Sequence, residues 1–134
     1  MHNEVVRRFL SPETLPSPAG YSHVVEVRAA RVIYVSGQVP LDRDGRLLGE
    51  GDLEAQTRQV FENLQAALDA AGASWADVVK LNYYLVDASE LTAVRAIRDE
   101  YVDTAHPPAS TLVEVSRLFR DDVLIEIDAV AIAE

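Results

Sequence analysis

Six short segments of the chain are rich in β-branched residues or alternate apolar and polar residues with a period of two, which is typical of β-strands. They are "VVRRF" (5–9), "VVEV" and "VIYV" within 22–37, "DVVKLNYYLVD" (77–87), "STLVEVSR" (110–117) and "DVLIEIDAVAI" (122–132). The second and third segments flank "RAAR" (28–31), and a β-hairpin is the simplest interpretation of that arrangement. Pro107 and Pro108 block a helix before the fifth segment, so the chain should enter it as a strand.

A different spacing begins at Leu53. Apolar residues recur at intervals of three, four and seven as far as Ala71, which predicts an amphipathic helix. Asp52 suits the N-cap of this helix, because its carboxylate can accept a hydrogen bond from the first turn. Gly72 stands where a helix ends in the left-handed conformation. Both ends of this helix are therefore predicted from the sequence.

A second, shorter helix is predicted after the strand at 77–87. Asp87 and Glu90 are three residues apart and resemble a capping box at its start. Its apolar stripe comprises Leu91, Val94 and Tyr101. The element order is therefore βββαβαββ.

This order predicts an α+β fold in which a six-stranded mixed sheet carries both helices on one face. The whole chain, residues 1–134, reads as a single domain. The other face is too apolar for a sheet that is simply open to water, so we expect it to pack against sister subunits. The residues predicted on this face are Asn82, Tyr84, Val86, Leu112, Glu114, Leu124, Glu126, Asp128 and Val130.

Composition narrows the range of functions. No apolar run approaches the roughly 18 residues that a membrane span requires, and charges interrupt the apolar residues of the N-terminal "MHNEVVRRFL", so a cytoplasmic location is expected. The chain has no cysteine, and its three histidines, at positions 2, 23 and 106, lack the spacing of metal ligands. We therefore expect no bound metal.

The charge balance bears on possible partners. Lysine and arginine number 12 against 22 aspartate and glutamate residues, for a net charge of −10 spread along the chain. Binding to phosphate backbones relies on a basic face, so nucleic acid is not expected as a partner. The basic clusters "RAAR" (28–31) and "VRAIR" (94–98) are interpreted as solvated surface.

Glu126 is the sharpest candidate for acid–base chemistry. It lies in mid-strand between Ile125 and Ile127, and side-chain alternation places it on the same face as Leu124 and Asp128. A carboxylate held among apolar neighbours acquires a raised pKa and becomes useful as a proton acceptor or donor. A solvated or ion-paired carboxylate on a half-exposed strand is the alternative interpretation.

The segment "VSGQVP" (35–40) ends a predicted strand in Ser-Gly-Gln. Gly37 permits close backbone approach and leaves amide donors free for an anion. Ser36 would need a neighbouring base to act as a nucleophile, and the sequence identifies none, so a structural serine is the alternative. The chain contains no Ser-His-Asp order, P-loop, GxGxxG or HExxH motif.

The ordered segments "YVSGQVPLD", "VFENLQAALDAAGAS", "ADVVKLNYYLVD", "PPASTLVEVSRL" and "IEIDAVAI" resemble the RidA/YjgF family of small cytoplasmic proteins, also known as the endoribonuclease L-PSP family. The resemblance extends from about residue 20 to the end of the chain. It implies a chorismate-mutase-like fold assembled as a homotrimer, with three sheets facing a common centre. It also implies a cleft for a small metabolite at each subunit interface.

The best-known members of this family hydrolyse reactive enamines and imines to 2-keto acids and ammonia without a metal or cofactor, and in them an arginine of a "PAR" motif holds the substrate carboxylate. The matching stretch here is Pro108-Ala109-Ser110, so the arginine is absent. The resemblance assigns Glu126 the role of placing the attacking water, and an asparagine of the family aligns with Arg95. The residues expected to contact the substrate are Tyr21, Ser36, Gly37, Arg95, Ser110 and Leu112.

The change from arginine to serine should greatly weaken binding of a substrate carboxylate. Arginine grips a carboxylate through two parallel charge-assisted hydrogen bonds, whereas serine offers one neutral donor. Losing one side of a desolvated charged pair typically costs about 2 to 5 kcal/mol. Arg95 either swings into the cleft and compensates or is a solvated arginine on an exposed helix position.

Three hypotheses follow. The first is a cofactor-free hydrolytic deaminase of imines or enamines whose specificity is altered by Ser110, with Glu126 orienting or deprotonating water. The second is a noncatalytic protein that binds or senses small metabolites in the interfacial cleft. The third is endoribonuclease activity, which the net charge of −10 and the lack of a histidine pair make the weakest.

Overall fold

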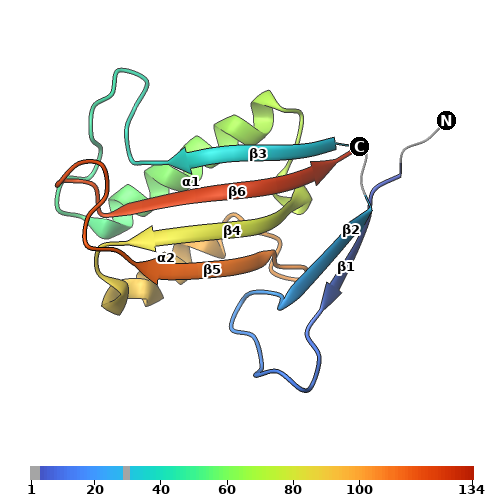
Figure 1. Ribbon diagram of the computed structural model, residues 1–134. Helices are drawn as coiled ribbons and strands as arrows, with labels where there is room; N and C mark the ends of the chain where they lie inside the picture. The colour runs from blue at the N-terminus through green and yellow to red at the C-terminus, as the bar shows by residue number, and fades with distance from the viewer. Residues whose placement is uncertain (1–3, 29–30) are drawn as a thin grey trace.

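The computed structural model describes residues 4–28 and 31–134, and its strands and helices follow the predicted order (Figure 1). Two short 3-10 helices, η1 and η2, precede β4 and α2. The elements are β1 (Val6–Leu10), β2 (Val24–Arg28), β3 (Arg31–Gln38), α1 (Leu53–Ala70), η1 (Trp75–Asp77), β4 (Val78–Leu85), η2 (Ala88–Glu90), α2 (Leu91–Arg98), β5 (Ala109–Glu114) and β6 (Ile125–Ala133).

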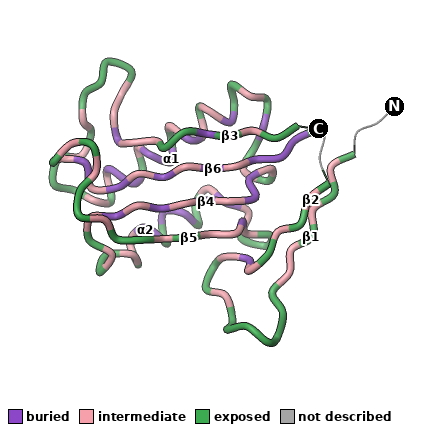
Figure 2. Tube along the Cα trace, viewed as in Figure 1, coloured by how far each residue is buried: buried purple, intermediate pink, exposed green. Residues whose placement is uncertain are grey.

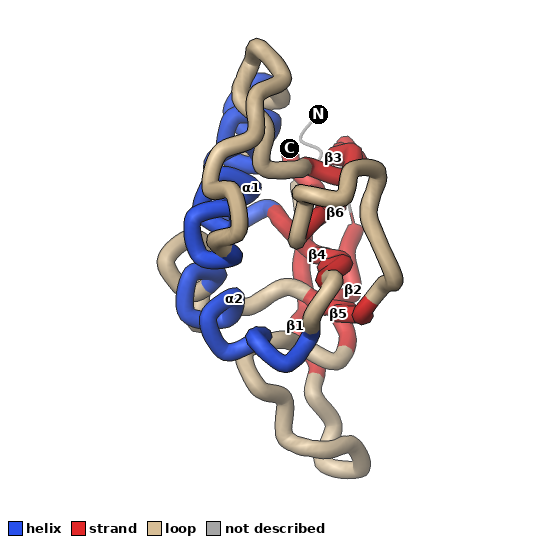
Figure 3. Tube along the Cα trace, turned by 90° about the vertical axis from the view of Figure 1, so that its left-hand side faces the viewer, coloured by secondary structure: helices blue, strands red, loops and turns tan. Residues whose placement is uncertain are grey.

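The main sheet has the strand order β3-β6-β4-β5, in which β4 and β5 run parallel and the other neighbours run antiparallel. Both helices cover one face of this sheet, as Figure 3 shows from the side. The predicted α+β fold with a mixed sheet and two helices on one face is therefore confirmed. The strands do not all join one sheet, however, because β1 and β2 form a separate two-stranded sheet.

The predicted hairpin within 22–37 is wrong. Strand β2 pairs with β1, and β3 pairs with β6 from the other end of the chain. The alternation of apolar residues identifies a strand but says nothing about its hydrogen-bonding neighbour, which long-range packing selects. Residues 29–30 of "RAAR" lie outside the described residues, as does the histidine at position 2.

The core lies between the sheet and the two helices (Figure 2). Phe61 of α1 is fully buried and stacks on Tyr101, with ring centroids 5.0 Å apart. Each fully buried large apolar side chain contributes roughly 1.5 to 3 kcal/mol relative to an exposed one, so this layer fixes both helices on the sheet. The other large apolar side chains that are completely buried include Leu64, Leu68, Leu81, Leu85, Ile125 and Ile127.

The start and the end of α1 lie where the sequence predicts them. Asp52 caps α1 by accepting a hydrogen bond from the Ala55 amide at 3.1 Å, and Gly72 follows the helix with a φ of 69°. Asp87 accepts hydrogen bonds from the Ser89 hydroxyl at 2.6 Å and from the Ser89 amide at 3.0 Å, and both lower the pKa of its carboxyl. That cap starts the 3-10 turn η2, and α2 itself begins at Leu91.

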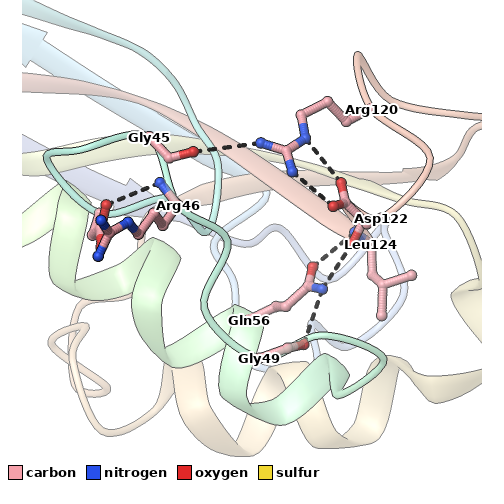
Figure 4. A network of polar contacts seen from close by, with 8 residues as sticks. Gly45, Arg46, Gly49, Gln56, Arg120, Asp122 and Leu124 are labelled. Carbon is pink, nitrogen blue, oxygen red and sulfur yellow. Dashed lines mark hydrogen bonds and ion pairs between the residues drawn. The ribbon is translucent and has the colours of Figure 1, made fainter.

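Two loops are fastened to α1 by one buried side chain, Gln56 (Figure 4). Its Nε2 donates to the carbonyls of Gly49 at 3.1 Å and Asp122 at 2.9 Å, and its Oε1 accepts from the Leu124 amide at 2.8 Å. Arg120 pairs with the Asp122 carboxylate at 2.7 Å in the same network. Because all these groups are paired, the polar side chain is compatible with burial in the core.

The face of the sheet away from the helices carries exposed apolar side chains. Tyr34 is 80% exposed and Val32 is 51% exposed. Leu112 was predicted on this face, but it pairs with Tyr83 and packs on the helix side of the sheet. The prediction failed because β5 is an edge strand with little apolar contrast between its two faces, so alternation does not fix which face is buried.

Candidate functional site

A cavity of about 230 Å³ lies between α2, β5 and the segment that leads into β2. Four of the residues expected to contact substrate come together here, namely Tyr21, Arg95, Ser110 and Leu112. The remaining lining residues are Ala19, Tyr83, Val94 and Arg98. The sequence therefore predicted four of the eight residues that line this cavity, but it missed two polar ones, Tyr83 and Arg98.

The proline pair before β5 holds one wall of this cavity. The Ser22 hydroxyl donates to the Pro107 carbonyl at 2.7 Å, and the Ser22 amide donates to the Pro108 carbonyl at 3.2 Å. These bonds fix the segment around Tyr21 against the entry to β5. The carbonyls that precede the strand thereby position both Tyr21 and Ser110 at the same cavity.

Arg98 is the first residue that sequence reasoning missed. Only 7% of its surface is exposed, although "VRAIR" was predicted to be solvated surface, so that prediction is wrong for this arginine. Its Nε donates to Asp99 at 2.9 Å. The signal was present in the sequence, because Arg98 lies four residues after Val94 and three before Tyr101, on the apolar stripe of the helix.

The backbone at Gly20 covers the guanidinium of Arg98. A Cβ atom at Gly20 would lie 2.1 Å from Nη2 and 2.8 Å from Cζ of Arg98, and Gly20 has a φ of +81°. A side chain at this position would displace the guanidinium and strain the backbone. The lack of a side chain at Gly20 therefore leaves the space that the Arg98 guanidinium occupies.

Tyr83 is the second missed residue. It is 3% exposed, and its hydroxyl is buried without a hydrogen-bond partner among the residues that the structure describes. Burial raises the pKa of this phenol, so the hydroxyl stays protonated and remains a donor. The alternation of β4 predicted its buried face correctly, but periodicity alone does not show whether a buried hydroxyl finds a partner.

Glu126 lies on the opposite, open face of the sheet, beside Gly37. A Cβ atom at Gly37 would lie 2.0 Å from Oε2 of Glu126, so a side chain at this position would displace the carboxylate. Burial, and secondarily the charge of Asp128, raise the pKa of the Glu126 carboxyl. Asp128 itself accepts hydrogen bonds from Asn82 at 2.7 Å and Tyr84 at 3.2 Å. The raised pKa of Glu126 therefore suits this carboxyl to proton transfer.

Ser36 does not belong to the cavity. It is exposed and borders a shallow groove with Tyr34 and Ala67 at the outer edge of β3. Its carbonyl accepts a hydrogen bond from the Gln38 side chain at 3.1 Å. Within the described part of the chain, the Ser36 hydroxyl makes no hydrogen bond to a base, which leaves the structural interpretation of this serine in place.

The residues of the predicted site do not all lie together within one chain. In the register of the main sheet, Ser110 pairs with Leu81, which is buried under the helices. Glu126 pairs with Tyr84, the neighbour whose side chain points to the other face. The substrate-contact residues around Ser110 and the candidate base Glu126 therefore lie on opposite sides of the same sheet.

Residues 4–28 and 31–134 contain no group of three or more histidine, cysteine, aspartate or glutamate side chains arranged to hold a metal ion. Over the same ranges, no helix has the length and apolar character needed to cross a bilayer.

Comparisons with known proteins agree with this architecture. The sequence profile described as Endoribonuclease L-PSP matches residues 12–133. A RutC family protein of Pyrococcus horikoshii is 39% identical over 130 residues, covering 96% of this chain and 100% of the relative. The 2-iminobutanoate/2-iminopropanoate deaminase of Salmonella typhimurium is 35% identical over 126 residues, covering 92% and 95% respectively.

A solved structure shows the same fold. The Rid family protein YyfB of Yersinia pestis superimposes with a TM-score of 0.83 at 38% identity, and the match covers 95% of this chain and 98% of that chain. The fold and both candidate sites define a small α+β protein with an acidic group on one face of the sheet and a cationic cavity on the other. The chain belongs to the RidA/YjgF family, as the ordered sequence motifs indicated.

Proposed function

We propose that this protein is a hydrolytic deaminase of small reactive imines or enamines, with Glu126 as the residue that transfers protons. The observation that carries the proposal is the Glu126 carboxyl, half-buried against Gly37 with a raised pKa. A carboxyl with a raised pKa is a better base than an ordinary glutamate and a better proton donor at neutral pH. The similarity to a protein named as a 2-iminobutanoate/2-iminopropanoate deaminase supports the same reaction class.

The reaction needs one base and one acid, and a single carboxyl can be both. Water adds to the imine carbon while the Glu126 carboxylate accepts a proton from it, and the C=N double bond becomes a C–N single bond. The protonated Glu126 then returns the proton to nitrogen, which gives a carbinolamine that carries a hydroxyl and an amino group. The Glu126 carboxylate next accepts the hydroxyl proton and delivers it to the amino nitrogen, so the C=O bond forms as the C–N bond breaks and ammonia leaves. The imine and one water thus yield a carbonyl compound and ammonia, with all atoms supplied by the reactants.

Glu126 and the cavity lie on opposite faces of the main sheet, and this arrangement supports a site between subunits. A substrate that contacts both Ser110 and Glu126 needs them from two different copies, because one sheet separates them within a chain. Exposed Tyr34 and Val32 provide apolar surface on the open face for such an assembly. We propose a cytoplasmic homotrimer with a cleft for a small metabolite at each interface. Light scattering should give three times 14.7 kDa, and a monomer mass would contradict the assembly.

The activity is tested with freshly generated imines of several amino acids, together with imines that lack a carboxylate, by following release of ammonia and carbonyl product. We expect Glu126→Gln to lower kcat by about 100-fold or more, the usual range for loss of a general base. Glu50→Gln, the same change on an exposed loop residue, is the matched control.

No release above background for any imine, or an unchanged rate in Glu126→Gln, would contradict the proposed mechanism. The second candidate function is then favoured, a noncatalytic protein that binds small metabolites. One observation supports that alternative specifically, because the cavity with its buried arginine forms within a single chain and does not involve Glu126.

A further inference from the structure

The cavity contains a buried cation whose hydrogen-bonding capacity is only partly used. The Nε atom of Arg98 donates a hydrogen bond to Asp99, a residue whose side chain is 49% exposed. Across residues 4–28 and 31–134, neither Nη nitrogen of Arg98 has a hydrogen-bond partner. Two parallel N–H donors therefore remain available in a cavity that Arg98 itself lines.

A second unused donor lines the same cavity. The Tyr83 hydroxyl is buried and, within the described part of the chain, has no partner. A buried polar group left without a partner typically costs about 1 to 3 kcal/mol, and native proteins rarely retain one without a reason. Within the described residues, the two Nη nitrogens of Arg98 and the Tyr83 hydroxyl lack acceptors, and one bound ligand would supply them.

The chemistry of these donors selects a carboxylate. Two parallel guanidinium N–H groups match the two oxygens of a carboxylate, and a protonated phenol adds a third donor to the same acceptor. The cavity of about 230 Å³ is smaller than the roughly 300 to 1,000 Å³ of pockets for drug-sized ligands. A small monocarboxylic acid therefore fits both the donors and the space.

We propose that Arg98 and the Tyr83 hydroxyl bind the carboxylate of a small 2-imino or 2-oxo acid in this cavity. Arg98 thereby replaces, from helix α2, the arginine that the family resemblance places at the position of Ser110. The assignment rests on the proposed deaminase function, because it identifies the substrate as an acid. It also explains why residue 110 is small, since a second arginine would compete with Arg98 for the same space and charge.

The test measures equilibrium binding by calorimetry, so it does not depend on turnover. The probe is 2-oxobutanoate, and its uncharged analogue 2-oxobutanamide is the control ligand. The unmodified protein should bind the acid at least about 30-fold more tightly than the amide, because loss of one side of a desolvated charged pair costs that much or more. Arg98→Met should abolish this preference.

Matched variants separate a binding role from a structural one. Arg43→Met removes one positive charge from an exposed turn and should bind both probes like the unmodified protein. Arg98→Lys keeps the charge without the paired donors and should recover only part of the preference. Arg98→Met combined with Ser110→Arg should restore it, because the second change returns a guanidinium to the same cavity. Circular dichroism on each variant establishes that it is folded.

The outcomes distinguish the two proposals. If no imine is hydrolysed but the preference for the acid depends on Arg98, the deaminase proposal fails and the carboxylate site stands. If imines are hydrolysed through Glu126 but acid and amide bind equally, the Arg98 assignment is overturned and the deaminase stands. Equal binding of the acid to the unmodified protein and to folded Arg98→Met also overturns the assignment.

Discussion

Gln56 of α1, Arg98 of α2 and Tyr83 of β4 all carry buried polar groups, but their hydrogen bonding differs. The Gln56 amide makes three hydrogen bonds, to Gly49, Asp122 and Leu124. The Tyr83 hydroxyl makes none within the described residues, and the only hydrogen bond from the Arg98 guanidinium there is the one to Asp99. The first arrangement is complete without a ligand, whereas the second becomes complete only with one.

The difference separates a structural polar group from a functional one. A buried group with all partners stabilises the fold, and its removal leaves other groups unpaired. A buried group without partners weakens the fold and is retained for another purpose. Substitutions at these positions should therefore change stability in opposite directions.

The largest effect is expected for Gln56→Leu. This change replaces the amide group by an apolar side chain of similar size and leaves the Asp122 carbonyl and the Leu124 amide unpaired, so the free energy of unfolding should fall by about 3 kcal/mol. Urea unfolding measures it. Gln59→Leu, one turn along α1 and with a single hydrogen bond to Asn63, is the control and should lose about 1 kcal/mol or less. Equal losses would refute the structural role of Gln56.

Gly20→Ala should have the next largest effect. The positive φ costs about 1 to 2 kcal/mol for alanine, and the new methyl group would displace the Arg98 guanidinium. Gly45→Ala is the control, since Gly45 has a φ of +78° and nothing within 4 Å of an added Cβ. Both variants should lose similar stability, but only Gly20→Ala should lose the binding preference for 2-oxobutanoate over its amide. Retained preference in Gly20→Ala would mean that the cation is not held by this contact.

Tyr83→Phe should leave the free energy of unfolding unchanged or raise it by up to about 1 kcal/mol, because it removes an unpaired buried hydroxyl. Tyr101→Phe is the control, since its hydroxyl donates to Glu62 at 2.7 Å and its loss should reduce stability. Thermal and urea unfolding without ligand give both values. A clear loss of stability in Tyr83→Phe would show that the hydroxyl has a partner, and the comparison with Gln56 would break down.

The smallest change is expected for Glu126→Gln, and it should depend on pH. The pKa of Glu126 is raised in the folded protein, so folding favours its protonated form. The stability associated with this group is present at acidic pH and is lost as pH rises through the raised pKa. Glu126→Gln should therefore be more stable than the unmodified protein at pH 7, and the difference should shrink towards about pH 4.

Urea unfolding of both proteins at several pH values measures this dependence, with Glu50→Gln as the exposed control. A difference that grows as pH falls would have the wrong sign and would contradict a desolvated carboxyl at position 126.

Much of the fold follows from local patterns. The period of α1, its cap at Asp52 and its end at Gly72 depend on neighbouring residues alone, so sequence reasoning predicts them well. The pairing of β2 with β1 instead of β3 could not be predicted, because strand pairing depends on contacts between distant segments. The face of Leu112 was also mistaken, since an edge strand has weak contrast between its two sides.

The candidate site shows the same division. The resemblance and the alternation of β6 identified Glu126, and the motif around Ser110 identified one wall of the cavity. Arg98 was assigned to the surface because charged residues are rarely buried, and that general tendency outweighed its place on the apolar stripe of α2. Arg95 does line the cavity, but it is exposed, so Arg98 is the better-placed cation.

The sequence by itself determined the elements, the family and the absence of the expected arginine at position 110, because these are properties of residue type and spacing. The tertiary structure decided that Glu126 and Ser110 lie on opposite faces of the sheet. It also decided that Arg98 enters the cavity beneath Gly20, beside an unpartnered Tyr83 hydroxyl. These features depend on which distant segments meet, and hydrogen-bond satisfaction and burial are settled only when the chain has folded.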